Sequence, residues 1–267
     1  MGCIGIQFIN QTFTRFKVKF PDFIILGAAK CGTTALWYNL DKHPDITMVS
    51  KSSSSIEMNF WKGPPWNKGL DWYKKKFVGD FTGEKSTMYY LKRSSMRKIK
   101  KHIPDVKLIL CVRNPTDRAY SNWQMNFKAG KVSNFTYDIF TQRYALSGKY
   151  MYHIKNNVLP FFDKNKLHIY VSEYAKRNPK KEMNKVFDFL GVSHLDLPRR
   201  EIDGQLLKNR SRQEDIKLNR QEKFYRVWSK HSDRLTGPLR NECLKFFRPF
   251  NKKFFDYLGY EIKEWSH

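Results

Sequence analysis

The chain has 267 residues, of which 40% are apolar and 16% aromatic, and lysine and arginine outnumber aspartate and glutamate by 50 to 25. This length and apolar content favour one sizeable α/β domain with a packed core over a disordered chain. The formal net charge of +25 favours anionic partners such as nucleic acid, anionic lipid, acidic polymers or a phosphorylated cofactor. The basic residues are spread along the whole chain, so most are expected to form a solvated surface.

Two further classes of protein are disfavoured because their motifs are missing from the sequence. The four cysteines lie far apart and show no CxxC or Cys/His spacing, so neither a metal site nor a disulfide framework is expected. No run approaches the roughly 20 apolar residues of a membrane span, and the first residues lack the apolar core of a signal peptide. These features predict a cytoplasmic protein, or a Golgi lumenal one if the chain is a trimmed part of a longer protein.

The order of predicted elements indicates an α/β fold. Residues 1–20 are expected to form an arm, and residues 21–267 a single domain. The segments at 23–26, 46–49, 108–112 and 166–174 predict strands, and 81–90 predicts a strand that ends in a loop. The segments at 33–40, 70–77, 94–102, 115–127, 180–191 and much of the chain after 205 predict helices. The run at 108–112 is apolar without alternation, as in strands covered on both faces. We therefore expect an open, mostly parallel sheet flanked by helices, with ligands at the carboxyl ends of its strands.

The stretch GAAKCGTT, residues 27–34, has the outline of a phosphate-binding loop between a strand and a helix. Gly27 and Gly32 permit a tight path, the helix N-terminus favours an anion, and Thr33 and Thr34 add hydroxyl groups. In the common pattern the lysine follows the second glycine and serves a metal-bound triphosphate, whereas here Lys30 precedes Gly32. A monophosphate that bears one further group fits this order better.

A second anion-binding pattern follows the strand at 108–112. Arg113 directly follows the last residue of this strand, and Ser121 lies eight residues later in the next helix. An arginine fork with a hydroxyl group can hold a dianionic phosphate. Two phosphate sites at one sheet edge predict a ligand with two distant phosphates, such as a nucleoside bisphosphate.

The two stretches GAAKCGTTALWYNLDKHPDI and LILCVRNPTDRAYSNW resemble the cofactor motifs of the sulfotransferases that use 3′-phosphoadenosine 5′-phosphosulfate, PAPS. The pieces EMNFW, GEKSTMYY and NKKFFDYLGY are similar, in order and spacing, to the heparan sulfate sulfotransferase branch of that superfamily. The resemblance covers residues 21–262, nearly the whole chain. It implies a P-loop-like fold and transfer of a sulfuryl group from PAPS, without a metal, to a hydroxyl or amino group of a glycan or small molecule.

The resemblance also implies roles for individual residues. Glu57 would be the catalytic base, and Lys30 and Lys85 would stabilise charge on the oxygen that leaves the sulfur. The implied PAPS contacts are Lys30, Cys31, Gly32, Thr33 and Thr34 for the 5′-phosphosulfate, Arg113 and Ser121 for the 3′-phosphate, and Lys208 and Arg210 in a loop over the cofactor.

Several departures from the branch leave the acceptor open. Asn59 stands where the family has a histidine two residues after the glutamate, a serine run occupies 52–55, and Cys243 has no partner cysteine nearby. The basic composition favours an anionic acceptor. Two alternatives are a P-loop kinase, which lacks its GK[ST] motif here, and an inactive relative that still binds PAPS. Only non-specific nucleic-acid binding is expected, because no known recognition motif is present.

Overall fold

A parallel five-stranded sheet forms the centre of the computed structural model, which describes residues 19–50, 52, 55–195 and 234–266. The strand order is β2-β3-β1-β4-β5, and all neighbouring pairs are parallel. The strands are β1 (Phe23–Gly27), β2 (Thr47–Val49), β3 (Thr82–Lys85), β4 (Lys107–Val112) and β5 (Leu167–Val171). The predicted open parallel sheet is confirmed, while residues 1–18 of the expected arm lie outside the described residues.

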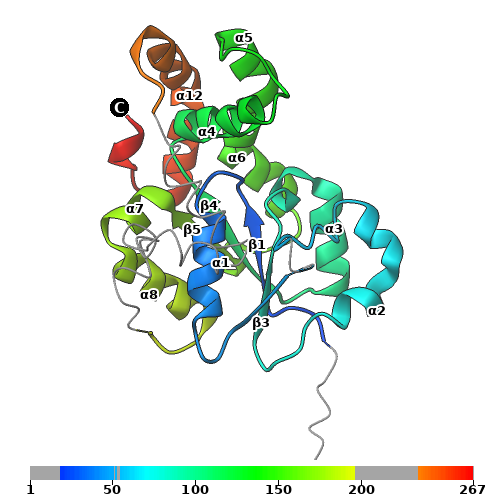
Figure 1. Cartoon of the computed structure of the whole chain (residues 1–267). Coiled ribbons are helices and arrows are strands. Elements are labelled where there is room, and N and C mark those ends of the chain that lie inside the picture. The colour runs from blue at the N-terminus through cyan, green and yellow to red at the C-terminus, as the bar shows by residue number, and fades with distance from the viewer. Residues whose placement is uncertain (1–18, 51, 53–54, 196–233, 267) are drawn as a thin grey trace, which may run out of the picture.

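Helices cover the sheet and extend beyond one end of it (Figure 1). The described helices are α1 (Thr33–Asp41), α2 (Gly69–Lys74), α3 (Arg93–His102), α4 (Pro115–Lys128), α5 (Tyr137–Ile139), α6 (Tyr150–His153), α7 (Ser172–Arg177), α8 (Pro179–Leu190) and α12 (Gly237–Leu258). In Figure 1, α7 and α8 lie on one side of the strands and α2 and α3 on the other. The group α4, α5, α6 and α12 stands above the strands. Among the described residues, no helix combines the length and apolar character needed to cross a bilayer.

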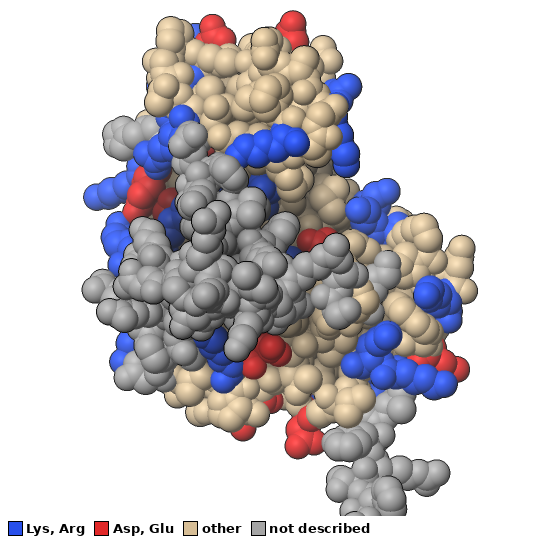
Figure 2. Space-filling model, viewed as in Figure 1, with Lys and Arg blue, Asp and Glu red and all other residues tan. Residues whose placement is uncertain are grey.

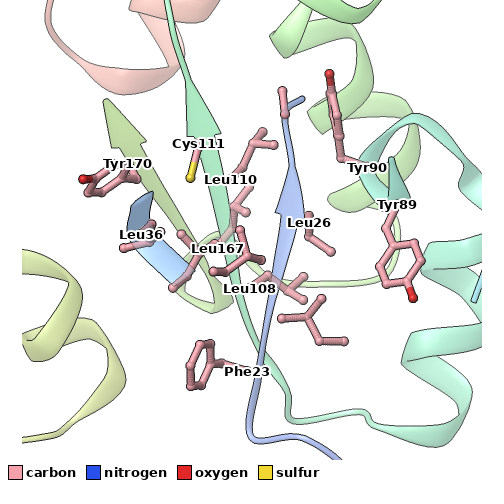
Figure 3. Close-up of a cluster of buried hydrophobic side chains, with 14 of the residues drawn as sticks. Phe23, Leu26, Leu36, Tyr89, Tyr90, Leu108, Leu110, Cys111, Leu167 and Tyr170 are labelled. Atoms are coloured by element: carbon pink, nitrogen blue, oxygen red, sulfur yellow. The ribbon is translucent and has the colours of Figure 1, made fainter. Parts of the chain in front are cut away.

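The core follows from the two central strands. Every residue of β1 is buried, and so are Leu108 to Val112 of β4. Figure 3 shows Leu108 and Leu110 of β4 beside Leu26 of β1, with Leu36 of α1 packed nearby. Side chains on both faces of these strands are therefore removed from water, which explains why their sequences show no polar alternation.

The strand predicted at 166–174 is shorter in the structure, and the strand within 81–90 ends at Lys85, before the predicted loop. The ladder between β4 and β5 ends at the pair Val112 and Val171, after which both chains enter helices. The ladder between β1 and β3 ends at Ile25 and Lys85. Ser172 then begins α7, and Ser86, whose N–H still donates to the carbonyl oxygen of Ile25 at 3.0 Å, begins a turn. Polar residues that follow β3 and β5 therefore lie at the same edge of the sheet.

The helices above the sheet have a small core of their own. Ala119 of α4, Tyr144, and Cys243 and Phe247 of α12 are buried together. Asp117 of α4 accepts a hydrogen bond of 2.6 Å from Arg240 of α12. These contacts hold α4, and therefore the segment that follows β4, in one place.

A substitution at Gly83 of β3 tests how closely this strand packs against β1. A Cβ atom at Gly83 would lie 2.2 Å from Cζ of Phe23, a side chain that is fully buried. We expect Gly83→Ala to lower the free energy of unfolding by about 1–3 kcal/mol, because the ring has no space into which it can move. Urea denaturation measures this change.

Gly63→Ala is the matched control. Its backbone is extended, with a φ of −150°, and the nearest atom to an added Cβ is 4.0 Å away. We expect a change below about 0.5 kcal/mol. Equal unfolding midpoints for the two variants would contradict the close packing of Gly83 against Phe23.

Candidate functional site

The loop between β1 and α1 offers backbone groups to an anion. Lys30 and Gly32 both have left-handed backbone conformations, with φ values of 74° and 78°. This conformation is unusual for lysine, and such outliers concentrate at functional sites. Gly32 is the N-cap of α1, and no side chain caps this helix. The first-turn N–H groups, beside the hydroxyl groups of Thr33 and Thr34, can therefore bind an anion.

Lys30 lies where several positive charges meet. Its side chain is buried, with 7% of the residue exposed. Burial, together with the nearby charges of Arg113 and Arg118, lowers the pKa of Lys30 from 10.5 to about 7. Other lysine and arginine side chains are scattered over the surface seen in Figure 2, as the sequence predicted. The concentration of charge at Lys30 is different, because it occurs in a partly desolvated place that an anion would stabilise.

Hydrogen bonds of Asn114 hold the segment that follows β4 directly after Arg113. The Asn114 side chain accepts hydrogen bonds from the N–H groups of Thr116 and Asp117, at 3.0 and 3.3 Å, and so caps α4. The Asn114 N–H donates to Oε1 of Glu173, at 2.8 Å. Since α4 is capped internally, an anion here would depend on side chains such as Arg113. Ser121 lies half-buried in α4, and its pairing with Arg113 stays a prediction.

A tyrosine hydroxyl joins the two loops. The hydroxyl of Tyr150, in α6, donates to the carbonyl oxygen of Arg113 at 2.8 Å, accepts from the Arg113 N–H at 3.3 Å, and lies 3.5 Å from Sγ of Cys31. Burial raises the pKa of the Cys31 thiol to about 11. The thiol is therefore protonated at neutral pH, and the contact of Cys31 with the 5′-phosphosulfate stays a prediction. Tyr150 fixes the Lys30 loop relative to Arg113.

Lys85, the last residue of β3, lies at the same edge of the sheet, and the predicted base Glu57 pairs with it. Nζ of Lys85 donates to Oγ1 of Thr34 at 3.0 Å and lies 3.4 Å from Oε1 of Glu57. Burial lowers the pKa of Lys85, and the Glu57 carboxylate partly offsets this effect. Oε1 of Glu57 accepts from Thr87 at 2.9 Å, and Oε2 accepts from Nδ2 of Asn59 at 3.4 Å. The Glu57 side chain is 27% exposed, so an acceptor can reach it.

The structure thus brings Lys30, Thr34, Glu57, Lys85 and Arg113 to one sheet edge, while their roles in binding and catalysis stay predictions. The predicted contacts Lys208 and Arg210 lie outside the described residues.

Sequence reasoning missed Tyr150 and Arg118. Arg118 is fully buried in α4 and donates to the carbonyl oxygen of Tyr144. The sequence does place Arg118 in the helix that follows Arg113, and this position is a signal that it lies near the site. Nothing in the sequence indicates that Tyr150 of α6 reaches the loops.

Comparison with known proteins gives the family. Residues 20–236 match the sulfotransferase domain family. The mouse bifunctional heparan sulfate N-deacetylase/N-sulfotransferase 1 is 30% identical over 198 residues, and the bovine bifunctional heparan sulfate N-deacetylase/N-sulfotransferase 2 is 31% identical over 198 residues. Each match covers 66% of this chain and 22% of the relative, so the chain spans less than a quarter of their length.

Solved structures agree on the fold. The sulfotransferase from Alicyclobacillus acidocaldarius has a TM-score of 0.69 at 22% identity and covers 94% of this chain and 100% of its own. The mouse sulfotransferase SULT7A1 complexed with PAP has a TM-score of 0.50 at 17% identity. It covers 90% of this chain and 86% of its own. The curated relatives confirm the resemblance to the heparan sulfate branch that the motifs indicated. The match over most of the chain, on this parallel sheet, makes the protein an enzyme of the sulfotransferase family.

Proposed function

We propose that this protein transfers a sulfuryl group from PAPS to a hydroxyl or amino group of a glycan. One observation carries the proposal: Lys85 contacts both Thr34, at the start of α1, and Glu57, the candidate base. A cation that touches the phosphate-binding helix and the base lies where charge develops during group transfer.

The residues present fit PAPS. The uncapped N-terminus of α1 and the buried Lys30 suit the 5′-phosphosulfate, and Arg113 with Ser121 suits the 3′-phosphate. The bisphosphate PAP in the structurally similar mouse enzyme supports this assignment. When bound, PAPS supplies an activated sulfuryl group.

The chain's own residues then act by position and charge. Glu57 takes the proton from the acceptor hydroxyl or amine, with its carboxylate oriented by Thr87 and Asn59. Lys85 and Lys30 stabilise negative charge on the oxygen that separates from sulfur. The Glu57 carboxylate, 3.4 Å from Nζ of Lys85, partly offsets the lowering of the Lys85 pKa by burial.

The acceptor and the metal requirement are part of the proposal. The names of the curated relatives favour a heparan-type glycan, and the net charge of +25 favours an anionic one. Within the described residues, no three His, Cys, Asp or Glu side chains group as metal ligands. We propose that sulfuryl transfer continues in the presence of a chelator. A P-loop kinase would stop under this condition, because its phosphoryl transfer requires magnesium. The compartment, cytoplasm or Golgi lumen, stays a prediction.

Glu57→Gln tests the assignment of the base. The amide cannot accept the acceptor proton, so we expect the rate of label transfer from radiolabelled PAPS to fall by about 10²–10⁴-fold. Transfer is measured with a chelator present, on a panel of glycans with free amines or hydroxyls, and on phenols and small amines.

Glu264→Gln is the matched control, because the Glu264 side chain is also 27% exposed and paired with a cation, Arg177. We expect wild-type transfer from this variant. Transfer that survives in Glu57→Gln would refute the base assignment. No transfer by the wild type to any acceptor, with PAP still bound, would favour the inactive relative.

The pKa of Lys30 predicts how PAP binding depends on pH. In the free protein this pKa is about 7, so Lys30 loses its proton as pH rises above 7. A bound phosphate favours the charged lysine, and binding at higher pH must therefore take up a proton. We expect the Kd for PAP to rise between pH 7 and pH 9, by at most about tenfold per pH unit. Isothermal titration calorimetry measures it.

Two variants separate Lys30 from the other cations. Lys30→Met should weaken PAP binding and flatten its dependence on pH in this range. Lys100→Met should retain the wild-type dependence, because Lys100 is exposed on α3, which leads to the amino end of β4. A wild-type Kd that is constant from pH 7 to pH 9 would contradict the role of Lys30.

A further inference from the structure

Glu84 of β3 is a buried carboxyl group for which the proposed reaction has no use. It is fully buried, and among the described residues it forms no ion pair with a lysine, arginine or histidine. Its partners are three hydroxyl groups: Tyr73 and Tyr89 donate to Oε1, and Ser86 donates to Oε2 at 2.8 Å. Burial raises the pKa of Glu84 to about 7. A carboxyl group in such a place is costly, so its hydrogen bonds should do more than fill space.

Ser86 connects Glu84 to the segment that carries Glu57. The Ser86 hydroxyl gives its hydrogen to Glu84 and accepts from the N–H of Asn59, at 2.8 Å. Because a serine hydroxyl has one hydrogen, the bond to Glu84 fixes the direction in which its lone pairs point. Asn59 has a left-handed backbone, with a φ of 51°. In this conformation its side-chain amide reaches back to Oε2 of Glu57 at 3.4 Å.

The other partners of Glu84 hold the far end of the same segment. The Trp61 N–H donates to the Tyr89 hydroxyl at 3.2 Å, and Nε1 of Trp61 donates to the Tyr73 hydroxyl at 3.0 Å. Both hydroxyls in turn donate to Glu84. The segment 57–61 is therefore attached at Asn59 and at Trp61 to one buried carboxyl group.

We propose that Glu84 and Ser86 position the base: Glu84 orients the Ser86 hydroxyl, Ser86 holds the backbone of Asn59, and Asn59 holds Oε2 of Glu57. This relay rests on the proposed role of Glu57. It gives Asn59 a function of its own, as a neutral donor to the base. Ser86 and Glu84 are positioning residues, since neither lies on the carboxylate of Glu57 itself.

Ser86→Ala breaks the relay, and Ser95→Ala is its matched control. Both hydroxyls are fully buried and both bind the segment 57–61, but Ser95 donates to the carbonyl oxygen of Trp61, at 3.0 Å, and not to Asn59. We expect Ser86→Ala to lower kcat by about 10- to 100-fold, because small displacements of a catalytic group are costly. The KM for PAPS should stay within about twofold, because no donor-site residue changes.

The pH profile distinguishes positioning from a purely structural role. In Ser86→Ala the acid limb of the plot of kcat against pH should move to higher pH. The reason is that the Glu57 carboxylate is protonated more readily when it loses the hydrogen bond from Asn59. Ser95→Ala should keep the wild-type kcat and profile, whatever its effect on thermal stability. Ser86→Thr, which retains the hydroxyl, should recover most of the kcat.

Asn59→Gly tests the last step of the relay without breaking the core. Glycine accepts the positive φ, so only the side-chain amide is lost. We expect a lower kcat and the same shift of the acid limb. This variant also answers the question if Ser86→Ala does not fold.

The outcomes separate the relay from the proposed function. If Glu57→Gln abolishes transfer while Ser86→Ala and Asn59→Gly retain the wild-type kcat and pH profile, the relay is overturned and Glu57 remains the base. If Glu57→Gln retains transfer, the base assignment fails first and the relay fails with it. A lower kcat with a shifted acid limb in both variants, rescued by Ser86→Thr, supports the relay.

Discussion

The parallel pairing of β1 with both β3 and β4 is the constraint on which the site depends. Ile25 pairs with Lys85 on one side, and Gly27 pairs with Leu110 on the other. Since parallel strands end at one edge, this register sets the Lys30 loop between Lys85 and the segment that carries Arg113. A different strand order would separate the three cations, however well each loop folded.

The electrostatic consequence is a site under strain before any ligand arrives. Lys30, Arg113 and Arg118 repel one another, and burial adds to the cost, as the lowered pKa of Lys30 shows. Glu57 offsets part of this charge at Lys85. The remaining excess of positive charge is what a doubly phosphorylated ligand would relieve. Packing elsewhere must supply the stability that this site lacks, and the buried residues of β1 and of β4 from Leu108 to Val112 contribute to it.

Asn59 shows how a departure from a family pattern can be read structurally. A histidine at this position could exchange a proton, whereas an asparagine can only donate and accept hydrogen bonds. Here it donates to Glu57 and is itself held by Ser86. The substitution therefore fits the proposal that one carboxylate accepts the proton and its neighbours only orient it.

The sequence by itself determined the parallel α/β fold and indicated two candidate anion-binding loops, because glycine spacing and unbroken apolar runs are local properties of the chain. The order of its motifs, through the resemblance to a family, supplied the proposed roles of Lys30, Lys85, Arg113 and Glu57. It could not show that Tyr150 joins the two loops, or that Arg118 adds to the charge around Lys30. The link from Glu84 through Ser86 to Asn59 was equally hidden. These contacts connect residues up to 119 positions apart. Only the packing of α6 and α4 above the sheet, and of the segment 57–61 against β3, brings such groups within hydrogen-bonding or electrostatic range, since local sequence patterns carry no information about which distant side chains meet.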